Sequence, residues 1–177
     1  MDTEPSSNCP ENPTMTAQAA ERLLHKGQDM ALCCNPLEPY LNSGANPLRF
    51  QAPSTSLWRG YVGTWAIENQ RLYLVSLQGY VGNMDEVKEV GLEALFPAYP
   101  QGVFAHWFSG ELRCPSGALL HYVHGSYASS YERDLFIEVR RGVVGKEHEV
   151  VNGQAEPKAP EGYTLAAHTS MGNLKRN

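Results

Sequence analysis

The sequence has no apolar run that approaches the roughly 18 residues needed to cross a bilayer. Its N-terminus, MDTEPSSNCPENP, lacks both the basic start and the apolar core of a signal peptide. We therefore expect a cytoplasmic protein that does not associate with a membrane.

Basic residues are also scarce. The 14 Lys and Arg are outnumbered by 19 Asp and Glu, which gives a formal net charge of −5. Surfaces that bind nucleic acid normally gather Lys and Arg on one face. We therefore expect no nucleic-acid partner, and this composition points to no particular basic partner.

The residue patterns that hold metals and phosphates are missing as well. Cys33 and Cys34 are adjacent, so on a strand they point to opposite faces, and His121 and His124 do the same at their spacing of three. Neither a Walker nor a Rossmann glycine pattern occurs, and Ser109 lacks the first glycine of a nucleophile elbow. We expect reduced thiols, no metal and no cofactor.

What the sequence does contain is strand-forming residues. Aromatic and β-branched side chains crowd Leu57 to Ile67 and Arg71 to Val81, and the polar Glu68-Asn69-Gln70 separates them, as in a β-hairpin. Leu72 to Val75 is an unbroken apolar run, typical of a strand covered on both faces. We expect this hairpin to form the middle of a sheet, with Trp58 and Trp65 buried.

Shorter patterns predict the remaining elements. Lys26-Gly27 favours a tight turn between strands at 22–25 and 29–33, and Leu37, Tyr40 and Leu41 suit a short helical turn. Asp85 is placed to cap a helix that runs to Phe96. Further strands are expected at 103–108, 111–114, 118–124, 135–140 and 143–151, with turns at Pro115-Ser116-Gly117 and Arg141-Gly142.

These elements predict one domain. Residues 1–16 read as a disordered tail, residues 17–151 as a single globular domain, and residues 152–177 as a loose C-terminal tail. About eight strands with short links and one inserted helix indicate an α+β, mainly β fold. The expected architecture is a curved antiparallel sheet or partial barrel.

Several stretches resemble a group of small uncharacterised bacterial proteins: Trp58-Arg59-Gly60-Tyr61-Val62, then Trp107-Phe108-Ser109-Gly110-Glu111-Leu112-Arg113, then Tyr131-Glu132-Arg133-Asp134-Leu135. The likeness covers roughly Glu21 to Gly142. The members look like the small acidic cytosolic proteins that accompany interbacterial toxins. The resemblance implies a bacterial origin and an immunity-like role with a toxin-like protein partner, and it transfers no catalytic residue.

The candidate site residues fall into two sets. For catalysis, His106 is a possible general base that Glu111 or Glu132 orients. The enzyme alternative places His106, Glu111 and Arg59 in one pocket, with Tyr131 nearby. Arg59 needs an acidic partner, for which Glu111, Glu132 and Asp134 are available. For binding, the candidates are aromatic, arginine and acidic side chains: Arg59, Tyr61, Trp107, Arg113, Tyr127, Tyr131, Glu132 and Asp134.

The function that these observations favour is non-catalytic protein binding of the immunity type. Two alternatives stay open: a small-ligand-binding barrel, and a small hydrolase or transferase that uses the pocket of His106, Glu111 and Arg59. The sequence indicates no oligomeric state.

Overall fold

The computed structural model describes residues 17–46, 48–83 and 85–155. The tail predicted at 1–16 and most of the one predicted at 152–177 lie outside these residues. The elements in chain order are β1 (Glu21–His25), β2 (Gln28–Leu32), α1 (Glu38–Asn42), η1 (Thr55–Leu57), β3 (Tyr61–Glu68), β4 (Arg71–Gly82), β5 (Val87–Val90), η2 (Leu92–Ala94), β6 (Val103–Phe104), β7 (Gly110–His121), β8 (Ser130–Arg140) and β9 (Val143–Val151).

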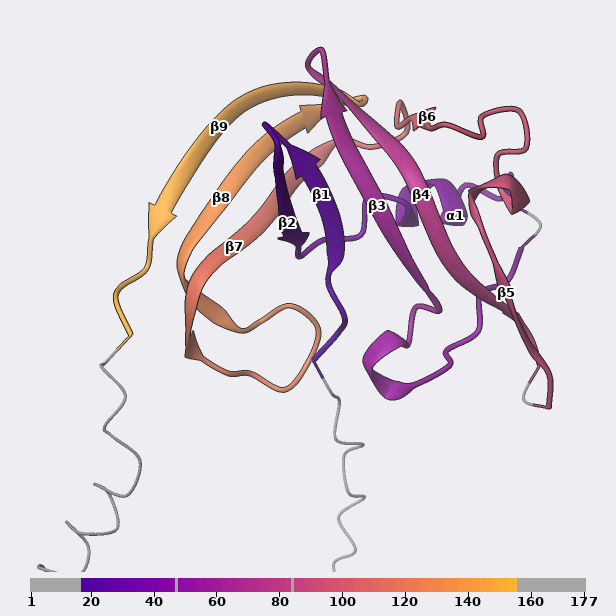
Figure 1. The fold of residues 1–177 in the computed structure, drawn as a ribbon, viewed down its shortest axis with the longest axis horizontal. Coiled ribbons are helices and arrows are strands. Elements are labelled where there is room, and N and C mark those ends of the chain that lie inside the picture. Colours follow the sequence, from indigo (N-terminus) through magenta and orange to yellow (C-terminus); the bar gives the residue numbers. More distant parts are fainter. Residues whose placement is uncertain (1–16, 47, 84, 156–177) are drawn as a thin grey trace, which may run out of the picture.

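The nine strands form one curved sheet in the order β2-β1-β3-β4-β9-β8-β7, with β5 and β6 also paired to β4 (Figure 1). The pairings are antiparallel except that of β1 with β3, which is parallel. The predicted mainly β fold with a curved sheet is therefore confirmed, with this one parallel pair as an addition. No helix in the described residues is long and apolar enough to cross a membrane.

The sheet curves until its two ends approach each other. Just beyond β2, the Cys33 amide donates a hydrogen bond of 2.8 Å to the carbonyl oxygen of Arg113 on β7. On the opposite side, β4 and β9 pair in register only at Arg71 and Val143. The result is a split barrel, with one seam between β2 and β7 and a second between β4 and β9.

Three tight turns set the register of the hairpins. In each, both central residues have positive φ: Lys26-Gly27 at 51° and 75°, Asn69-Gln70 at 49° and 59°, and Arg141-Gly142 at 47° and 80°. Turns of this geometry match the right-handed twist of the strands that they join. The hairpin predicted around Lys26-Gly27, the central hairpin and the Arg141-Gly142 turn are all confirmed.

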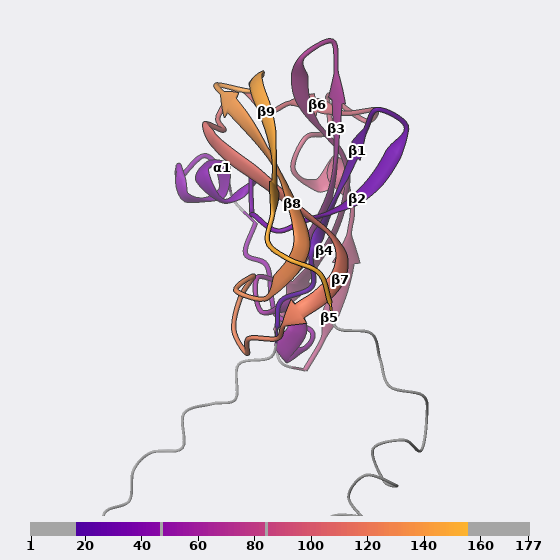
Figure 2. The same ribbon diagram turned by 90° about the vertical axis from the view of Figure 1, so that its left-hand side faces the viewer.

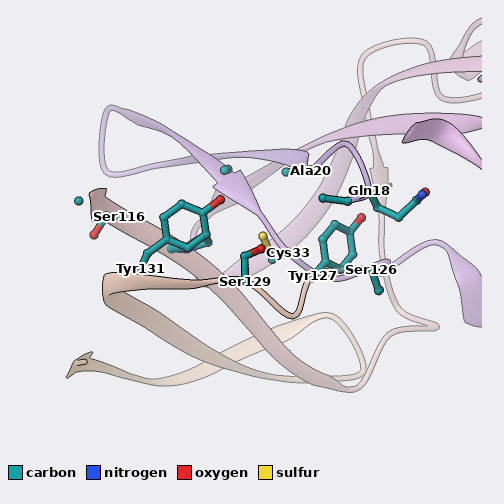
Figure 3. A pocket seen from close by; sticks show the side chains of 12 residues that line it. Gln18, Ala20, Cys33, Ser116, Ser126, Tyr127, Ser129 and Tyr131 are labelled. Atoms are coloured by element: carbon teal, nitrogen blue, oxygen red, sulfur yellow. The ribbon is translucent and has the colours of Figure 1, made fainter. Parts of the chain in front are cut away.

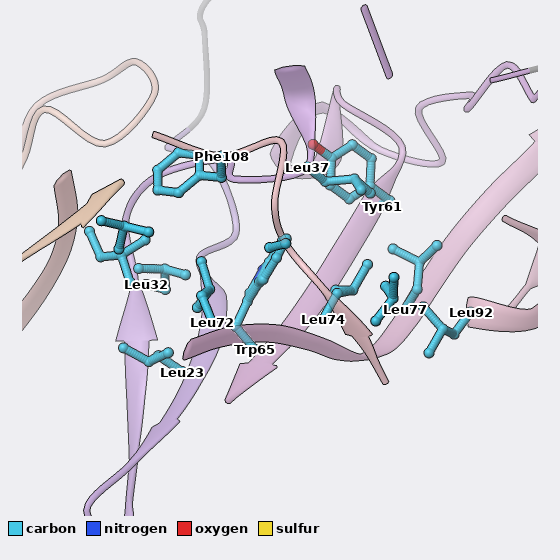
Figure 4. Packing of buried hydrophobic residues seen from close by; sticks show 14 of the residues in the cluster. Leu23, Leu32, Leu37, Tyr61, Trp65, Leu72, Leu74, Leu77, Leu92 and Phe108 are labelled. Atoms are coloured by element: carbon cyan, nitrogen blue, oxygen red, sulfur yellow. The ribbon is translucent and has the colours of Figure 1, made fainter. Parts of the chain in front are cut away.

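The core fills the space that the strands enclose (Figure 4). Trp65, Leu72, Leu74, Leu112 and Ile137 are fully buried there. On β4, Leu72 and Leu74 face the core, while Tyr73 and Val75 are only half-buried. The predicted burial of both faces of this strand is thus correct for one face and partial for the other.

The helix predicted from Asp85 to Phe96 is wrong. Strand β5 occupies its first half and pairs with the end of β4 from Gly79 to Gly82, and only η2 is helical. The edge of β4 that faces away from β3 carries backbone donors and acceptors from Gly79 to Gly82, and pairing with β5 satisfies them better than a separate helix would. Val87, Val90 and Gly91 are poor helix formers, so little opposes the extended conformation.

Two further expectations are corrected in the second half of the chain. The predicted strand 103–108 is reduced to β6, and the two strands predicted at 111–114 and 118–124 are one continuous strand, β7. Pro115-Ser116-Gly117 makes an irregularity in the pairing of β7 with β8 rather than a turn. A bulge accommodates the positive φ of Gly117, at 80°, without ending the strand. The predicted helical turn around Tyr40 is confirmed as α1.

Trp58 and Trp65 make a matched pair for testing the core, because Trp65 is fully buried whereas Trp58 is 54% exposed. The prediction that both rings are buried is therefore wrong for Trp58, which precedes β3. We expect Trp65→Ala to lower the free energy of unfolding by about 3 to 5 kcal/mol. Trp58→Ala should change it by about 0.5 kcal/mol or less. Urea denaturation followed by circular dichroism measures both, and equal losses would contradict this core.

Candidate functional site

The predicted catalytic residues lie in different surroundings. His106 is exposed, with Nδ1 3.3 Å from the carbonyl oxygen of Phe104 and its ring edge-on to Trp107. Glu111 is exposed on β7, opposite Glu138 of β8. Arg59 is buried beside Glu21. None of the three residues lines either of the two pockets described below.

Arg59 lies in the loop between η1 and β3 rather than inside a strand. Its side chain is only 5% exposed, and its Nε is 3.5 Å from Oε1 of Glu21, which is fully buried on β1. Its Nη2 donates a hydrogen bond of 2.8 Å to the carbonyl oxygen of Ala19. The prediction of an ion pair was therefore correct, but its partner is Glu21 and none of the three acids proposed from the sequence.

Aromatic rings complete the surroundings of this ion pair. The guanidinium lies 5.4 Å from the ring centre of Tyr61 and 5.9 Å from that of Tyr127. The Trp65 indole donates a hydrogen bond to Oε2 of Glu21. Burial raises the pKa of Glu21 to about 7, against the opposing effects of the Trp65 hydrogen bond and the Arg59 charge. The carboxyl of Glu21 therefore titrates near neutral pH.

Some polar atoms of this group stay without hydrogen bonds among the described residues: Oε1 of Glu21 and both Nε and Nη1 of Arg59. Leaving buried donors and acceptors without partners costs free energy. The attraction between the two charges and the contacts of the guanidinium with the aromatic rings offset this cost. Tyr127 is tied to this group from the other side, since its hydroxyl donates to Oδ1 of Asn35 at 2.8 Å.

A second arginine, Arg113 on β7, fixes the loop between β7 and β8. Its Nη1 and Nη2 donate to the carbonyl oxygens of Tyr127 and Ser129 at 2.7 and 3.0 Å. Its Nε donates to Oδ1 of Asp134 at 2.8 Å. Asp134 is 5% exposed and accepts a further hydrogen bond from Asn152. Arg113 and Asp134, both predicted to bind a partner, thus hold the fold together.

The chain beyond β9 is anchored to the same region. The Asn152 side chain donates to the carbonyl oxygen of Tyr131, and Oε1 of Glu132 accepts the Ala155 amide at 2.9 Å. Oε2 of Glu132 accepts the Ala118 amide at 3.1 Å. These hydrogen bonds lower the pKa of Glu132. Residues 152–155 are therefore held in place, whereas the sequence predicted a loose tail from residue 152.

Trp107 belongs to an aromatic cluster beside α1. Its ring centre lies 5.0 Å from that of Tyr40 and 5.5 Å from that of Phe96, which is stacked on it. Its indole donates to the carbonyl oxygen of Pro36 at 2.9 Å. This half-buried ring fastens α1 to the sheet.

A pocket lies where the end of β2 comes beside β7 and the loop between β7 and β8. Figure 3 shows the side chains that line it. We call it the seam pocket; its volume is about 160 Å³. In the close view, Tyr127 and Tyr131 lie at opposite ends, with Cys33 and Ser129 between them. The lining residues are Ala17, Gln18, Ala20, Ala31, Cys33, Pro115, Ser116, Gly117, Ser126, Tyr127, Ser129 and Tyr131.

A second hollow of about 360 Å³ lies beside the turn of the β1–β2 hairpin. The side chains of Leu24, Lys26 and Asp29 in its wall are exposed, so it is shallow. The turn itself is fixed to β9, because Glu147 bonds both His25 and Lys26 at 2.7 Å. The side of this hollow formed by the turn is thus held by these two contacts with Glu147.

Sequence reasoning identified Arg59, Arg113, Tyr127 and Tyr131 but missed Glu21 and most of the residues that line the two pockets. Glu21 faces inward in a short strand that alternates buried and exposed residues. The only signal in the sequence is its spacing of two from Leu23, which puts both residues on one face of a strand. Cys33 becomes part of a pocket only because β2 comes to lie beside β7. Within the described residues, no three His, Cys, Asp or Glu side chains are grouped to hold a metal ion.

No family model matches this chain, and no curated protein or solved structure matches it either. The resemblance to small bacterial proteins stays a prediction from the sequence. Function is therefore argued from the geometry of the described residues.

The buried carboxyl of Glu21 leads to a prediction about pH. Its pKa is raised from 4.5 to about 7 on folding, so the folded protein binds the proton more tightly than the unfolded chain. Stability from this group is complete below pH 4.5 and is lost as the pH rises to about 7, a change of about 3 kcal/mol. Glu21→Gln should remove this loss.

The measurement is urea denaturation at pH 5 and pH 8. The difference in unfolding free energy between Glu21→Gln and the unmodified protein should move in favour of the variant by about 3 kcal/mol from the lower pH to the higher. Glu138→Gln, which removes an exposed carboxyl, is the control and should show no such change. A parallel pH dependence for Glu21→Gln and the unmodified protein would refute the neutral-range titration.

Proposed function

We propose that this chain is a non-catalytic protein-binding domain. Its partner docks on four side chains beside the seam pocket. They lie at the end of β7, the start of β8 and the end of β9. We call this surface the rim patch: Leu119, Tyr131, Arg133 and Val151. The observation that carries the proposal is that exposed apolar side chains, a tyrosine and an arginine share one face next to a preformed hollow.

The strand register places the rim patch on one face. Tyr131 is opposite Leu119, and Arg133 is opposite Val151. Residues directly opposite each other share a face, as do residues two apart on one strand, such as Tyr131 and Arg133. Leu119 is 46% exposed, Val151 67%, and the Arg133 side chain 61%. Tyrosine and arginine are enriched among the residues that anchor protein interfaces.

The size of the seam pocket favours a protein partner over a free small molecule. Sites for small ligands typically enclose about 300 to 1,000 Å³, whereas this pocket has about 160 Å³. The second hollow reaches that range at about 360 Å³, but exposed side chains form its wall, so it is shallow. Trp65, Leu72, Leu74 and Leu112 fill the interior of the split barrel. A ligand-binding barrel is therefore the weaker proposal.

The enzyme alternative finds less support still. A general base needs a partner that orients it and a hollow that brings it to a substrate. His106 and Glu111 line neither pocket, and the guanidinium of Arg59 is paired with Glu21.

The kind of partner follows from the net charge of the chain, and the cellular compartment from its cysteines. A net charge of −5 raises the rate of encounter with a basic protein, such as a toxin-like enzyme with a basic cleft. Cys33, Cys34 and Cys114 are free thiols, as expected in a reducing cytoplasm. The proposal is thus an immunity-like protein of bacterial origin that acts in the cytoplasm by blocking another protein.

The rim patch can be tested by placing a charge in it. Leu119→Asp and Val151→Asp should each weaken partner binding at least tenfold, because each replaces an apolar contact with a charge that loses its water when the partner docks. Val87→Asp is the matched control, since Val87 is equally exposed, at 46%, but lies on β5. The partner is captured from the native host, identified by mass spectrometry, purified and titrated by calorimetry.

Two results would overturn the proposal. One is that no purified partner binds at micromolar concentration. The other is that the two rim variants bind the partner as tightly as Val87→Asp does. Circular dichroism of each variant confirms that it is folded before the titration.

A further inference from the structure

The seam pocket has the volume of one aromatic ring. A cavity of about 150 Å³ in another protein holds a benzene molecule, and the seam pocket has about 160 Å³. Tyr127 and Tyr131 are among its lining residues, and Tyr131 also belongs to the rim patch (Figure 3). A side chain of a protein docked on the rim patch therefore has a hollow of suitable size directly beside it.

The walls of the pocket suit an uncharged group. Its twelve lining residues include no Asp, Glu, Lys, Arg or His. Among the polar groups in the wall, the Tyr127 hydroxyl donates to Asn35 and the Ser129 hydroxyl accepts the Val123 amide at 3.0 Å. Oε1 of Gln18 has no hydrogen-bond partner among the described residues, so it can accept a hydrogen bond from a bound hydroxyl. Burial raises the pKa of both Cys33 and Tyr127, so both stay neutral. A charged side chain would lose its water in this pocket and gain little in return.

The pocket is also fixed in shape before anything binds. On one side, the Gln18 amide donates to the carbonyl oxygen of Ser126 at 3.2 Å, and the Ala19 amide donates to that of Ser56 at 2.8 Å. On the other side, Arg113 holds the carbonyl oxygens of Tyr127 and Ser129. A cavity that is already formed does not have to be ordered on binding, which favours its use as an anchor point.

We propose that the seam pocket receives one uncharged aromatic side chain of the partner, a phenylalanine or a tyrosine. The ring lies between Tyr127 and Tyr131, where aromatic contacts favour it, and over the Cys33 thiol. This inference rests on the proposed function and adds the chemistry of the group that the partner inserts.

Small probes test the pocket without the partner. Toluene and p-cresol represent the two side chains, and benzoate and benzylammonium are charged rings of similar size. Each is titrated into the labelled full chain, and the amide resonances of Cys33, Tyr127 and Tyr131 are followed by NMR. We expect the neutral probes to bind with a Kd on the order of 1 mM, and the charged ones at least tenfold more weakly.

Filled-pocket variants provide the specificity control. Ala31→Leu, on an exposed position of β2, and Ala20→Leu should both abolish the probe-induced shifts. Ala94→Leu adds the same atoms on an exposed position of η2, far from the pocket in sequence, and should leave them unchanged. Equal binding of charged and neutral probes, or binding that survives both filled-pocket variants, would overturn the inference.

The same variants separate this inference from the proposed function. Ala31→Leu should weaken binding of the purified partner at least tenfold. If Leu119→Asp abolishes partner binding while Ala31→Leu leaves it intact, the proposed function stands and the aromatic anchor is wrong. If neither substitution affects partner binding, the proposed function itself fails.

Discussion

The buried ion pair between Glu21 and Arg59 joins the first strand of the sheet to the loop that leads into β3. Glu21 begins β1, Arg59 precedes β3, and the two strands are the parallel pair of the sheet. Two charges removed from water lose several kcal/mol of hydration each, and their attraction offsets this only with good additional contacts. Here Trp65, the Ala19 carbonyl and the rings of Tyr61 and Tyr127 supply those contacts. The pairing of β1 with β3 therefore depends on one interaction whose desolvation is costly.

Arg113 also stabilises the fold, because it holds the loop between β7 and β8 at the wall of the seam pocket. The sequence nevertheless predicts a residue that binds a partner. An arginine between aromatic and acidic residues has the composition of an interface in sequence. In the folded protein its donors are directed to Asp134 and to two carbonyl oxygens of the β7–β8 loop. In the proposed interface, such a residue would act indirectly, by holding Tyr127 and Ser129 in place while Tyr131 and Arg133 contact the partner.

The parts of the fold that could be predicted from sequence are those fixed by local physics. Lys26-Gly27 and Arg141-Gly142 determine tight turns by themselves, and the alternation of Leu135, Ile137 and Val139 marks β8. Strand β5 was missed because it exists only through its pairing with the end of β4. Likewise, the partner of Arg59 lies at Glu21, across a connection that no periodicity in the sequence describes. The seam pocket needs β2 beside β7, which depends on the closure of the whole sheet.

The single register at which β4 and β9 pair bears on how the chain reaches this structure. Strands β7, β8 and β9 follow one another as a meander, so their contacts close short loops and cost little chain entropy. The parallel pairing of β1 with β3 has to wait for the long segment between them to be placed. Because so little of the ladder joins β4 to β9, we expect the meander to form independently of β1 to β4 and the closure of the two seams to be the slow step of folding.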